Sequence, residues 1–290
     1  MKGTIIKALS GFYYVDTGEE IYACRARGIF KNQGIKPYVG DEVDMEVTHE
    51  QDKEGFITAI NERKNSFIRP PIANVQQFAV IASAARPDPN TDIIDKFLAN
   101  AEKAGTEIVI CINKTDIDKK GNTEWLKSIY SDIYRVFIVS GKTGEGLEEL
   151  KSALAGKRTA FAGASGVGKS TILNGLHPDA PAETGSVSEK TKRGRHTTRH
   201  VELFRLDNGG EIYDTPGFTS FETTDATEEE LQHLFPEISR FAGKCRFDNC
   251  RHISEPECAV RQALDRGDIS ISRYESYLSQ LEEIKERNSY

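Results

Sequence analysis

The stretch that decides the fold is Gly163-Ala164-Ser165-Gly166-Val167-Gly168-Lys169-Ser170, followed by Thr171. It has the form G-x-x-x-x-G-K-[ST] and directly follows the apolar segment 159–162, which is typical of a buried strand. The glycines let consecutive backbone N–H groups curl around a phosphate, Lys169 supplies a positive charge, and Ser170 offers a hydroxyl to Mg²⁺. A strand, this loop and a helix predict a nucleotide-binding α/β domain with phosphate contacts across 163–171. The weaker alternative is a glycine-rich turn without function.

A second motif, Asn113-Lys114-Thr115-Asp116, indicates which base the site prefers. It follows the apolar segment 107–112, where a loop would hang over a bound nucleotide. The Asp116 carboxylate can accept from the N1–H and the exocyclic amine of guanine, whereas adenine offers no matching pair of donors. Ser140-Gly141-Lys142, after the segment 136–139, can bring a backbone N–H to guanine O6. Together these motifs predict GTP and make an ATP-using kinase the least favoured class.

A third motif, Asp214-Thr215-Pro216-Gly217, ends the strand-like segment 211–213. Asp214 can hold Mg²⁺ through water, and the Gly217 amide can sense a γ-phosphate. Thr197 or Thr198, in the basic segment 190–199, is placed to complete the Mg²⁺ shell. Ordinary small GTPases carry the phosphate loop first, but here the base motifs precede it, so the domain is circularly permuted. The site tolerates this order because it is built at the carboxyl ends of parallel strands.

The flanking regions predict two further parts of the chain. Short apolar segments separated by Gly, Asp and Pro predict a small β-barrel such as an OB-fold, with strands at 4–8, 12–16, 21–27, 39–47 and 56–60. On that barrel, Arg25 and Arg27 with Tyr13, Tyr14 and Tyr22 could form a nucleic-acid face, and ordinary solvated charges are an equal alternative. The C-terminal part is predicted to be mainly helical, with capping-box patterns at 227–230 and 272–275.

The central region alternates between strand and helix patterns. Strand-like segments occur at 78–82, 107–112, 136–139, 159–162, 201–206 and 211–213. One helix starts at Asp92 and stops at Gly105, with an apolar face of Ile93, Ile94, Phe97, Leu98 and Ala101. Another follows Gly146. This alternation predicts a mostly parallel sheet covered by helices on both faces.

Three of the five cysteines lie close together near the C-terminus with a histidine among them: Cys245, Cys250, His252 and Cys258. Three thiolates and an imidazole form a closed tetrahedral donor set that suits structural Zn²⁺. The alternative is reduced, buried cysteines beside a surface histidine. The odd cysteine count does not fit a complete disulfide framework.

The composition and the net charge limit the classes of function that this chain can have. The 290 residues are 38% hydrophobic and carry a net charge of −7, with no apolar run near the length of a membrane span. We expect a soluble, cytoplasmic, monomeric protein without a membrane partner. The negative net charge of the whole chain argues against a nucleic-acid partner, but the charge is unevenly distributed. Residues 211–237 hold eight acids and no Lys or Arg, whereas the net charge is +4 over 186–200 and +3 over 238–252. Basic residues therefore gather in segments that could face RNA.

The permuted motifs, the barrel-like N-terminus and the Cys/His cluster together resemble the RsgA (YjeQ/YloQ) family of bacterial, small-subunit-dependent GTPases over essentially the whole chain. The resemblance implies an OB-fold RNA-binding domain at 1–66, a permuted GTPase domain at 67–222 and a zinc-binding domain at 223–290. It also implies the small ribosomal subunit and its rRNA as partners, GTP and GDP as ligands, Mg²⁺ with the nucleotide, and one structural Zn²⁺ on the four Cys/His positions. The family acts late in small-subunit maturation, and the subunit stimulates its GTPase activity.

The residue that orients the attacking water differs from the one in Ras-like enzymes. Phe218 stands where Ras-like enzymes have the water-positioning Gln, and a phenyl ring cannot hydrogen-bond water. His196 matches the histidine that the resembling family is thought to use instead, and an imidazole can accept from water at neutral pH. The alternative is that His196 packs or contacts RNA. Two competing functions remain open: a nucleotide-gated RNA-binding module with little hydrolysis, and a GTPase that serves a protein or membrane process.

Overall fold

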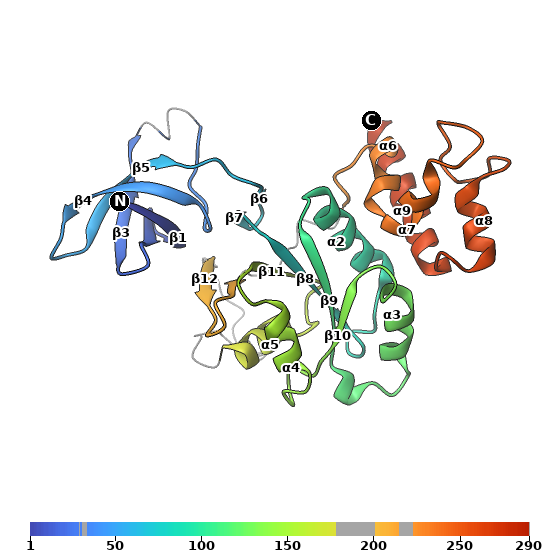
Figure 1. Ribbon diagram of the computed structural model, residues 1–290, viewed down its shortest axis with the longest axis horizontal. Helices are drawn as coiled ribbons and strands as arrows, with labels where there is room; N and C mark the ends of the chain where they lie inside the picture. The colour runs from blue at the N-terminus through green and yellow to red at the C-terminus, as the bar shows by residue number, and fades with distance from the viewer. Residues whose placement is uncertain (29, 31–33, 178–200, 215–222, 290) are drawn as a thin grey trace, which may run out of the picture. The chain divides into compact units, whose positions relative to one another are not determined.

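The computed structural model describes residues 1–28, 30, 34–177, 201–214 and 223–289 (Figure 1). The chain forms two compact units. The first contains Met1–Gln77, Lys151–Phe161 and Leu173–Phe218, and the second contains Phe78–Leu150, Ala162–Ile172 and Thr219–Tyr290. Among the described helices, none has the length and apolar character needed to cross a membrane.

The N-terminal part of the first unit is a closed five-stranded barrel. Its strands are β1 (Lys2–Leu9), β2 (Phe12–Asp16), β3 (Ile21–Ala26), β4 (Glu42–His49) and β5 (Glu54–Ile60). They pair in the order β1-β2-β3-β5-β4, and a further pairing of β4 with β1 closes the sheet. Only β3 and β5 run parallel within this barrel. Alternate side chains, including Ile5, Val15 and Ile57, are fully buried inside it. The predicted OB-type barrel is confirmed.

The barrel continues into the strands of the central domain within the same unit. Strand β1 pairs antiparallel with β12 (Glu202–Arg205), which pairs antiparallel with β13 (Glu211–Asp214). Strand β13 in turn runs parallel to β11 (Arg158–Ala162). The remaining elements that begin or end in this unit are β6 (Ser66–Ile68), β7 (Pro71–Ala73), α4 (Leu147–Ala153) and α5 (Lys169–Leu176). A continuous hydrogen-bonded sheet thus leads from the barrel to the strand before the phosphate loop.

The second unit contains the other strands of the central domain. Strands β8 (Gln77–Ser83), β9 (Glu107–Asn113) and β10 (Arg135–Ile138) lie in the order β10-β9-β8, with β9 and β10 parallel. The helices are α2 (Thr91–Lys103) and α3 (Asn122–Tyr130), with a 3₁₀ turn η1 (Thr115–Ile117). The strand–helix alternation is as predicted. One residue of the predicted apolar face is wrong: Ile93 is 38% exposed, because it sits in the first turn of α2 on the side away from the sheet-facing Ile94, Phe97 and Leu98.

The C-terminal part of the second unit is helical, as predicted. Its elements are α6 (Glu228–Leu231), η2 (Gln232–Leu234), α7 (Pro236–Ala242), α8 (Ala259–Arg266) and α9 (Ile271–Asn288). The first capping box is confirmed, since Thr227 accepts from the Glu230 N–H and Glu230 accepts from the Thr227 N–H. The second is wrong: Ser270 is the N-cap, and Ser272 lies inside the first turn of α9. The helix starts earlier because its first turn must place Arg273 in the buried core.

Arg273 joins this helical part to α2. Its guanidinium lies 2.6 Å from Glu237 Oε1 on α7 and 2.7 Å from Asp95 Oδ1 on α2, and all three side chains are buried. Tyr130 Oη, at the end of α3, also donates to Asp95 Oδ1 at 2.8 Å. The two carboxylates give the guanidinium the counter-charge that it needs when it is buried. The helices around the Cys/His cluster and the helices beside β9 therefore belong to one packed body.

Candidate nucleotide and metal sites

The phosphate loop follows β11 directly, and α5 begins at its Lys169. Gly163 and Gly168 have φ values of +142° and +100°. A Cβ atom would lie 2.4 Å from the Ile81 carbonyl oxygen at Gly163 and 2.2 Å from Asn113 Nδ2 at Gly168. Only glycine fits both positions without displacing a neighbour, which explains why the loop can pass so close to β8 and β9.

Lys169 is folded over this loop. Its Nζ donates to the carbonyl oxygens of Gly163 at 2.7 Å and Ala164 at 2.8 Å. Burial lowers the pKa of this ammonium group to about 8. A desolvated ammonium on a rigid backbone loop at a helix N-terminus is a strong point charge for an anion. The arrangement is suited to a polyphosphate.

Asn113 brings the three nucleotide motifs together in the second unit. This side chain is 2% exposed at the end of β9. Its Nδ2 donates to the Val167 carbonyl at 2.8 Å, and its Oδ1 accepts from the Gly141 N–H at 3.0 Å. Lys114 Nζ also donates to the Gly166 carbonyl at 2.6 Å. The sequence motifs 113–116, 140–142 and 163–170 are therefore neighbours in space.

A buried serine orients Asp116, the carboxylate predicted to recognise guanine. Ser140, with no exposed surface, donates from Oγ to Asp116 Oδ1 at 2.8 Å. The Ser140 Oγ accepts from the Thr143 N–H at 3.2 Å, which directs the hydroxyl proton toward Asp116. Thr115 Oγ1 donates to the Val139 carbonyl at 3.0 Å and fixes the same turn to the end of β10. Asp116 itself is exposed, which leaves its carboxylate accessible for the predicted contact with guanine.

Asp214 ends β13 in the first unit. It stands directly opposite Glu202 of β12 in the strand register. Burial first, and then the charge of Glu202, raise the pKa of the Asp214 carboxyl. A cation next to this carboxylate relieves both penalties, which fits a role in holding Mg²⁺. The predicted residues His196, Thr197, Thr198 and Gly217 lie outside the described residues.

The four predicted metal ligands converge at the start of α8. The donor atoms of Cys245, Cys250, His252 and Cys258 all lie within 4.8 Å of one another. His252 Nδ1 is 3.5 Å from Cys245 Sγ and 3.4 Å from Cys258 Sγ, and the two sulfurs are 3.9 Å apart. Metal–ligand lengths of about 2.3 Å for sulfur and about 2.0 Å for nitrogen give tetrahedral edges of about 3.8 and about 3.5 Å. The donor set therefore fits a tetrahedral metal ion such as Zn²⁺.

The surroundings of this cluster support the ligand geometry. Gln232 Oε1 lies 3.0 Å from His252 Nε2, so the imidazole can donate there and keep Nδ1 free for a metal. Tyr274 Oη donates to the His252 carbonyl at 2.5 Å. Burial lowers the pKa of His252, which favours the neutral, ligating form. Gln232 was not identified from the sequence, since a lone glutamine 20 residues away carries no spacing signal.

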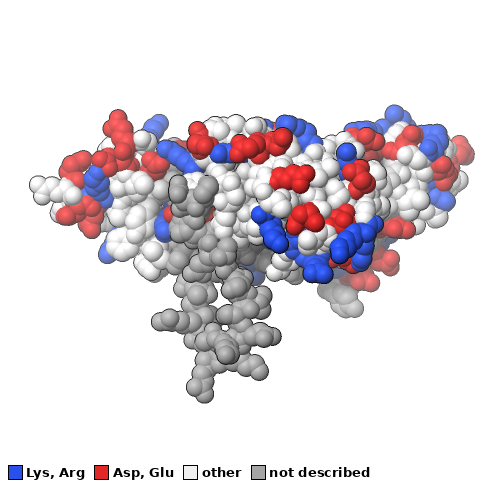
Figure 2. Space-filling view, turned by 90° about the horizontal axis from the view of Figure 1, so that it is seen from below, with Lys and Arg blue, Asp and Glu red and all other residues white. Residues whose placement is uncertain are grey.

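The proposed RNA-facing residues are only partly available on the surface. Tyr22 is 3% exposed inside the barrel, so it does not belong to a nucleic-acid face. Arg25 is exposed, and its guanidinium stacks 4.6 Å from the centre of the Phe12 ring. Near the metal cluster, Arg246 and Arg251 pair with Glu257 and Glu229. Basic and acidic side chains are interspersed on the face shown in Figure 2.

Asn113 joins the phosphate loop to two turns that carry the predicted base-recognition motifs. Both turns come before the phosphate loop in the chain, and this order defines a circularly permuted P-loop GTPase. Family models agree: residues 60–224 match the RsgA GTPase model and residues 2–57 match the RsgA N-terminal domain model. The chain belongs to the RsgA GTPase family and is a GTP hydrolase.

Full-length relatives support this assignment. The chain is 45% identical over 290 residues to the "Small ribosomal subunit biogenesis GTPase RsgA" of Alkaliphilus metalliredigens, covering 100% of this chain and 99% of that protein. It is 43% identical over 295 residues to the protein of the same name from Bacillus subtilis, covering 99% and 98%.

Two crystal structures share this architecture. YjeQ from Thermotoga maritima aligns with a TM-score of 0.84 at 38% identity, over 98% of both chains. YloQ, titled a circularly permuted GTPase, aligns with a TM-score of 0.80 at 39% identity, over 99% of this chain and 95% of that one.

Proposed function

We propose that this chain binds the small ribosomal subunit, hydrolyses GTP faster when it is bound, and assists late maturation of that subunit in the cytoplasm. The observation that supports it most strongly is the Asn113 junction, because it joins the phosphate loop to the two turns predicted to recognise guanine within one packed unit. The full-length relatives carry small-subunit biogenesis in their names, and this supports the choice of partner. We expect the protein to act as a monomer, with an OB-fold part at 1–66, a GTPase part at 67–222 and a metal-binding part at 223–290.

Each motif has a role in this proposal. Asp116 accepts from the guanine N1–H and amine, and the 140–142 turn gives a backbone N–H to guanine O6. The loop 163–171 binds the phosphates, Ser170 and Asp214 hold Mg²⁺ with Thr197 or Thr198, and the Gly217 amide senses the γ-phosphate. The Mg²⁺ ion neutralises charge on the phosphates when it is bound. Zn²⁺ on the Cys/His cluster has a structural role, since four protein ligands leave it no open position.

His196 is our candidate for orienting the attacking water. Because Phe218 cannot do so, we expect slow intrinsic hydrolysis that accelerates when the bound subunit positions His196 next to the attacking water. His196→Ala should retain GDP affinity and lose subunit-stimulated turnover. Full stimulated turnover in this variant would contradict the assignment.

The deciding experiment measures GTP hydrolysis by the full chain with and without purified small subunits, at fixed Mg²⁺ and ionic strength. Stimulation together with co-sedimentation supports the proposal. Stimulation is not expected from 50S subunits, which serve as the matched control. An unstimulated rate refutes subunit-dependent function, and co-sedimentation without any turnover would instead favour a nucleotide-gated RNA-binding module.

A further inference from the structure

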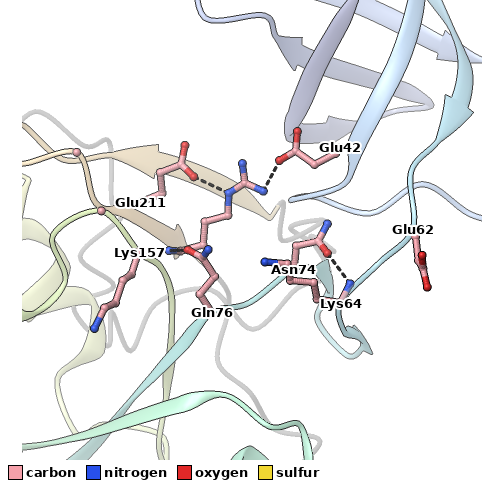
Figure 3. Close-up of a pocket in the computed structure, with 10 residues that line it drawn as sticks. Glu42, Glu62, Lys64, Asn74, Gln76, Lys157 and Glu211 are labelled. Carbon is pink, nitrogen blue, oxygen red and sulfur yellow. Dashed lines mark hydrogen bonds and ion pairs between the residues drawn. The ribbon is translucent and has the colours of Figure 1, made fainter.

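A polar hollow lies in the first unit where the barrel meets the strands of the central domain (Figure 3). Its volume is ≈ 380 Å³. Arg158, the first residue of β11, crosses one wall of it with a side chain that is 18% exposed. Five residues later the same strand leads into Gly163 of the phosphate loop. A mostly enclosed arginine at this position is not needed for strand formation, so its role must come from its contacts.

On the barrel side, Arg158 contacts three groups. Its NH1 lies 2.6 Å from Glu42 Oε1 and donates to the Gly40 carbonyl at 3.3 Å. Its NH2 donates to Thr4 Oγ1 at 3.1 Å. Thr4 lies on β1 and Glu42 begins β4, the two strands whose pairing closes the barrel. The position of the guanidinium therefore depends on how β1 and β4 are paired where the barrel closes.

On the central-domain side, Arg158 contacts the start of β13. Its Nε lies 2.6 Å from Glu211 Oε2, and Glu211 is only 14% exposed. The dashed lines to Glu42 and Glu211 in Figure 3 mark these two ion pairs. The Glu211 N–H donates to the Lys157 carbonyl at 2.9 Å, next to Arg158. Three residues beyond Glu211 the strand ends at Asp214.

One guanidinium thus holds the barrel to the first residues of two strands, and those strands end in the phosphate loop and in Asp214. Strands in a hydrogen-bonded sheet are stiff, so a displacement at one end is passed to the loop at the other. Glu42 is 44% exposed and can be reached by a partner on the barrel, whereas Glu211 is enclosed. The barrel-side pair is the weaker and more accessible half of the link.

We propose that Arg158 is a positioning residue that couples occupancy of the barrel to GTP hydrolysis. A partner that binds the barrel alters the ion pair between Glu42 and Arg158. Because Arg158 stays paired with Glu211, its side chain passes the displacement to β11 and β13. This inference rests on the proposed function for the identity of the partner, the small ribosomal subunit. The inference names the residues through which that partner would act on the nucleotide loops.

The chain offers matched controls for this path. Glu46 lies on the same strand as Glu42 and pairs with Arg27 on the exposed surface of the barrel. Lys7 of β1 pairs with Glu202 at 2.8 Å and links the barrel to β12 instead of β11. E46Q tests the loss of a β4 charge, and K7M tests the loss of a barrel–strand ion pair that does not involve Arg158 and leaves Glu202 beside Asp214 unchanged.

The experiment compares E42Q, E46Q, K7M, R158M and R158K in the full chain. The measurements are GDP affinity, basal turnover, small-subunit co-sedimentation and subunit-stimulated turnover. For E42Q we expect unchanged GDP affinity, basal rate and co-sedimentation, but a stimulation factor reduced about fivefold or more, the usual range for an allosteric coupling. R158M should lose the same stimulation, R158K should regain part of it, and E42Q should have no further effect on R158M.

The outcomes separate this inference from the proposed function. If the wild-type chain is not stimulated, both are wrong. If the wild-type chain is stimulated and E42Q responds as E46Q does, the inference alone is overturned. It is also overturned if E42Q lowers basal and stimulated rates equally, or if E42Q weakens co-sedimentation, since Glu42 would then shape the site or contact the subunit directly.

Discussion

The junction formed by Asn113 gives the sharpest test of the nucleotide site. Asn113→Ala removes the donor to the Val167 carbonyl and the acceptor for the Gly141 N–H, at 2.8 and 3.0 Å. A buried polar group without a partner costs about 1–3 kcal/mol, so the two broken bonds should destabilise the second unit by about 2–4 kcal/mol. GDP must then order the loops that Asn113 held in place, and we expect its Kd to rise about tenfold or more, equivalent to about 1.4 kcal/mol.

Fluorescence titration with a labelled GDP measures the Kd, and thermal unfolding measures the stability. Asn100→Ala is the matched control, since this buried amide on α2 donates to the Thr223 carbonyl and accepts from the Asp225 N–H, both at 3.2 Å, in the same unit. It should lower stability by a similar amount and leave the GDP Kd unchanged. A Kd for Asn113→Ala within about twofold of the wild type, or an equal rise in both variants, would show that the junction does not organise the site.

Three further predictions concern the core, the metal and pH. Arg273→Met leaves two buried carboxylates without a counter-charge and should lower the free energy of unfolding by about 3–5 kcal/mol. Arg266→Met removes an exposed ion pair and should cost less than about 1 kcal/mol. Equal melting temperatures for the two variants would contradict this. Chelation of the metal, or Cys245→Ser, should expose residues 243–258 to proteolysis while GDP affinity is retained, and an unchanged digestion pattern with no bound zinc would refute the structural role. The pKa of about 8 for Lys169 means that its charged form, the one that binds phosphate, is lost as the pH rises through 8. GDP affinity should therefore fall about fourfold between pH 7 and 8.5, and a flat profile would contradict this assignment.

The sequence predicted the elements whose signals are local. The strand before Gly163, the barrel strands and the Thr227 capping box all follow from short patterns of apolar, glycine and capping residues, and the structure confirms them. The Cys/His cluster was predicted because four ligands of the right chemistry lie within 14 residues. Motif chemistry likewise identified the loops that Asn113 brings together.

The errors and omissions come from tertiary contacts. Ser272 has the pattern of an N-cap, but the buried partners of Arg273 move the start of the helix to Ile271. The sequence allows Tyr22 to belong to a nucleic-acid face, yet the barrel register turns it inward on the same side of β3 as Cys24. Arg158 carries no sequence signal for its role, because its partners lie more than 50 residues away in both directions. Such residues become visible only when the distant strands are assembled.

The pairing of β1 with β12 has a consequence for studies of truncated chains. The backbone of β12 is covered on one side by β13 and on the other by β1, with Lys7 opposite Glu202. Deletion of residues 1–57 would leave β12 as an unprotected edge strand with unpaired N–H and C=O groups, which is a template for intermolecular pairing. Aggregation or lost activity in such a fragment would then report a damaged sheet rather than a missing RNA contact. Point variants on the outer face of the barrel leave that edge covered, and they are the better way to ask what the barrel binds.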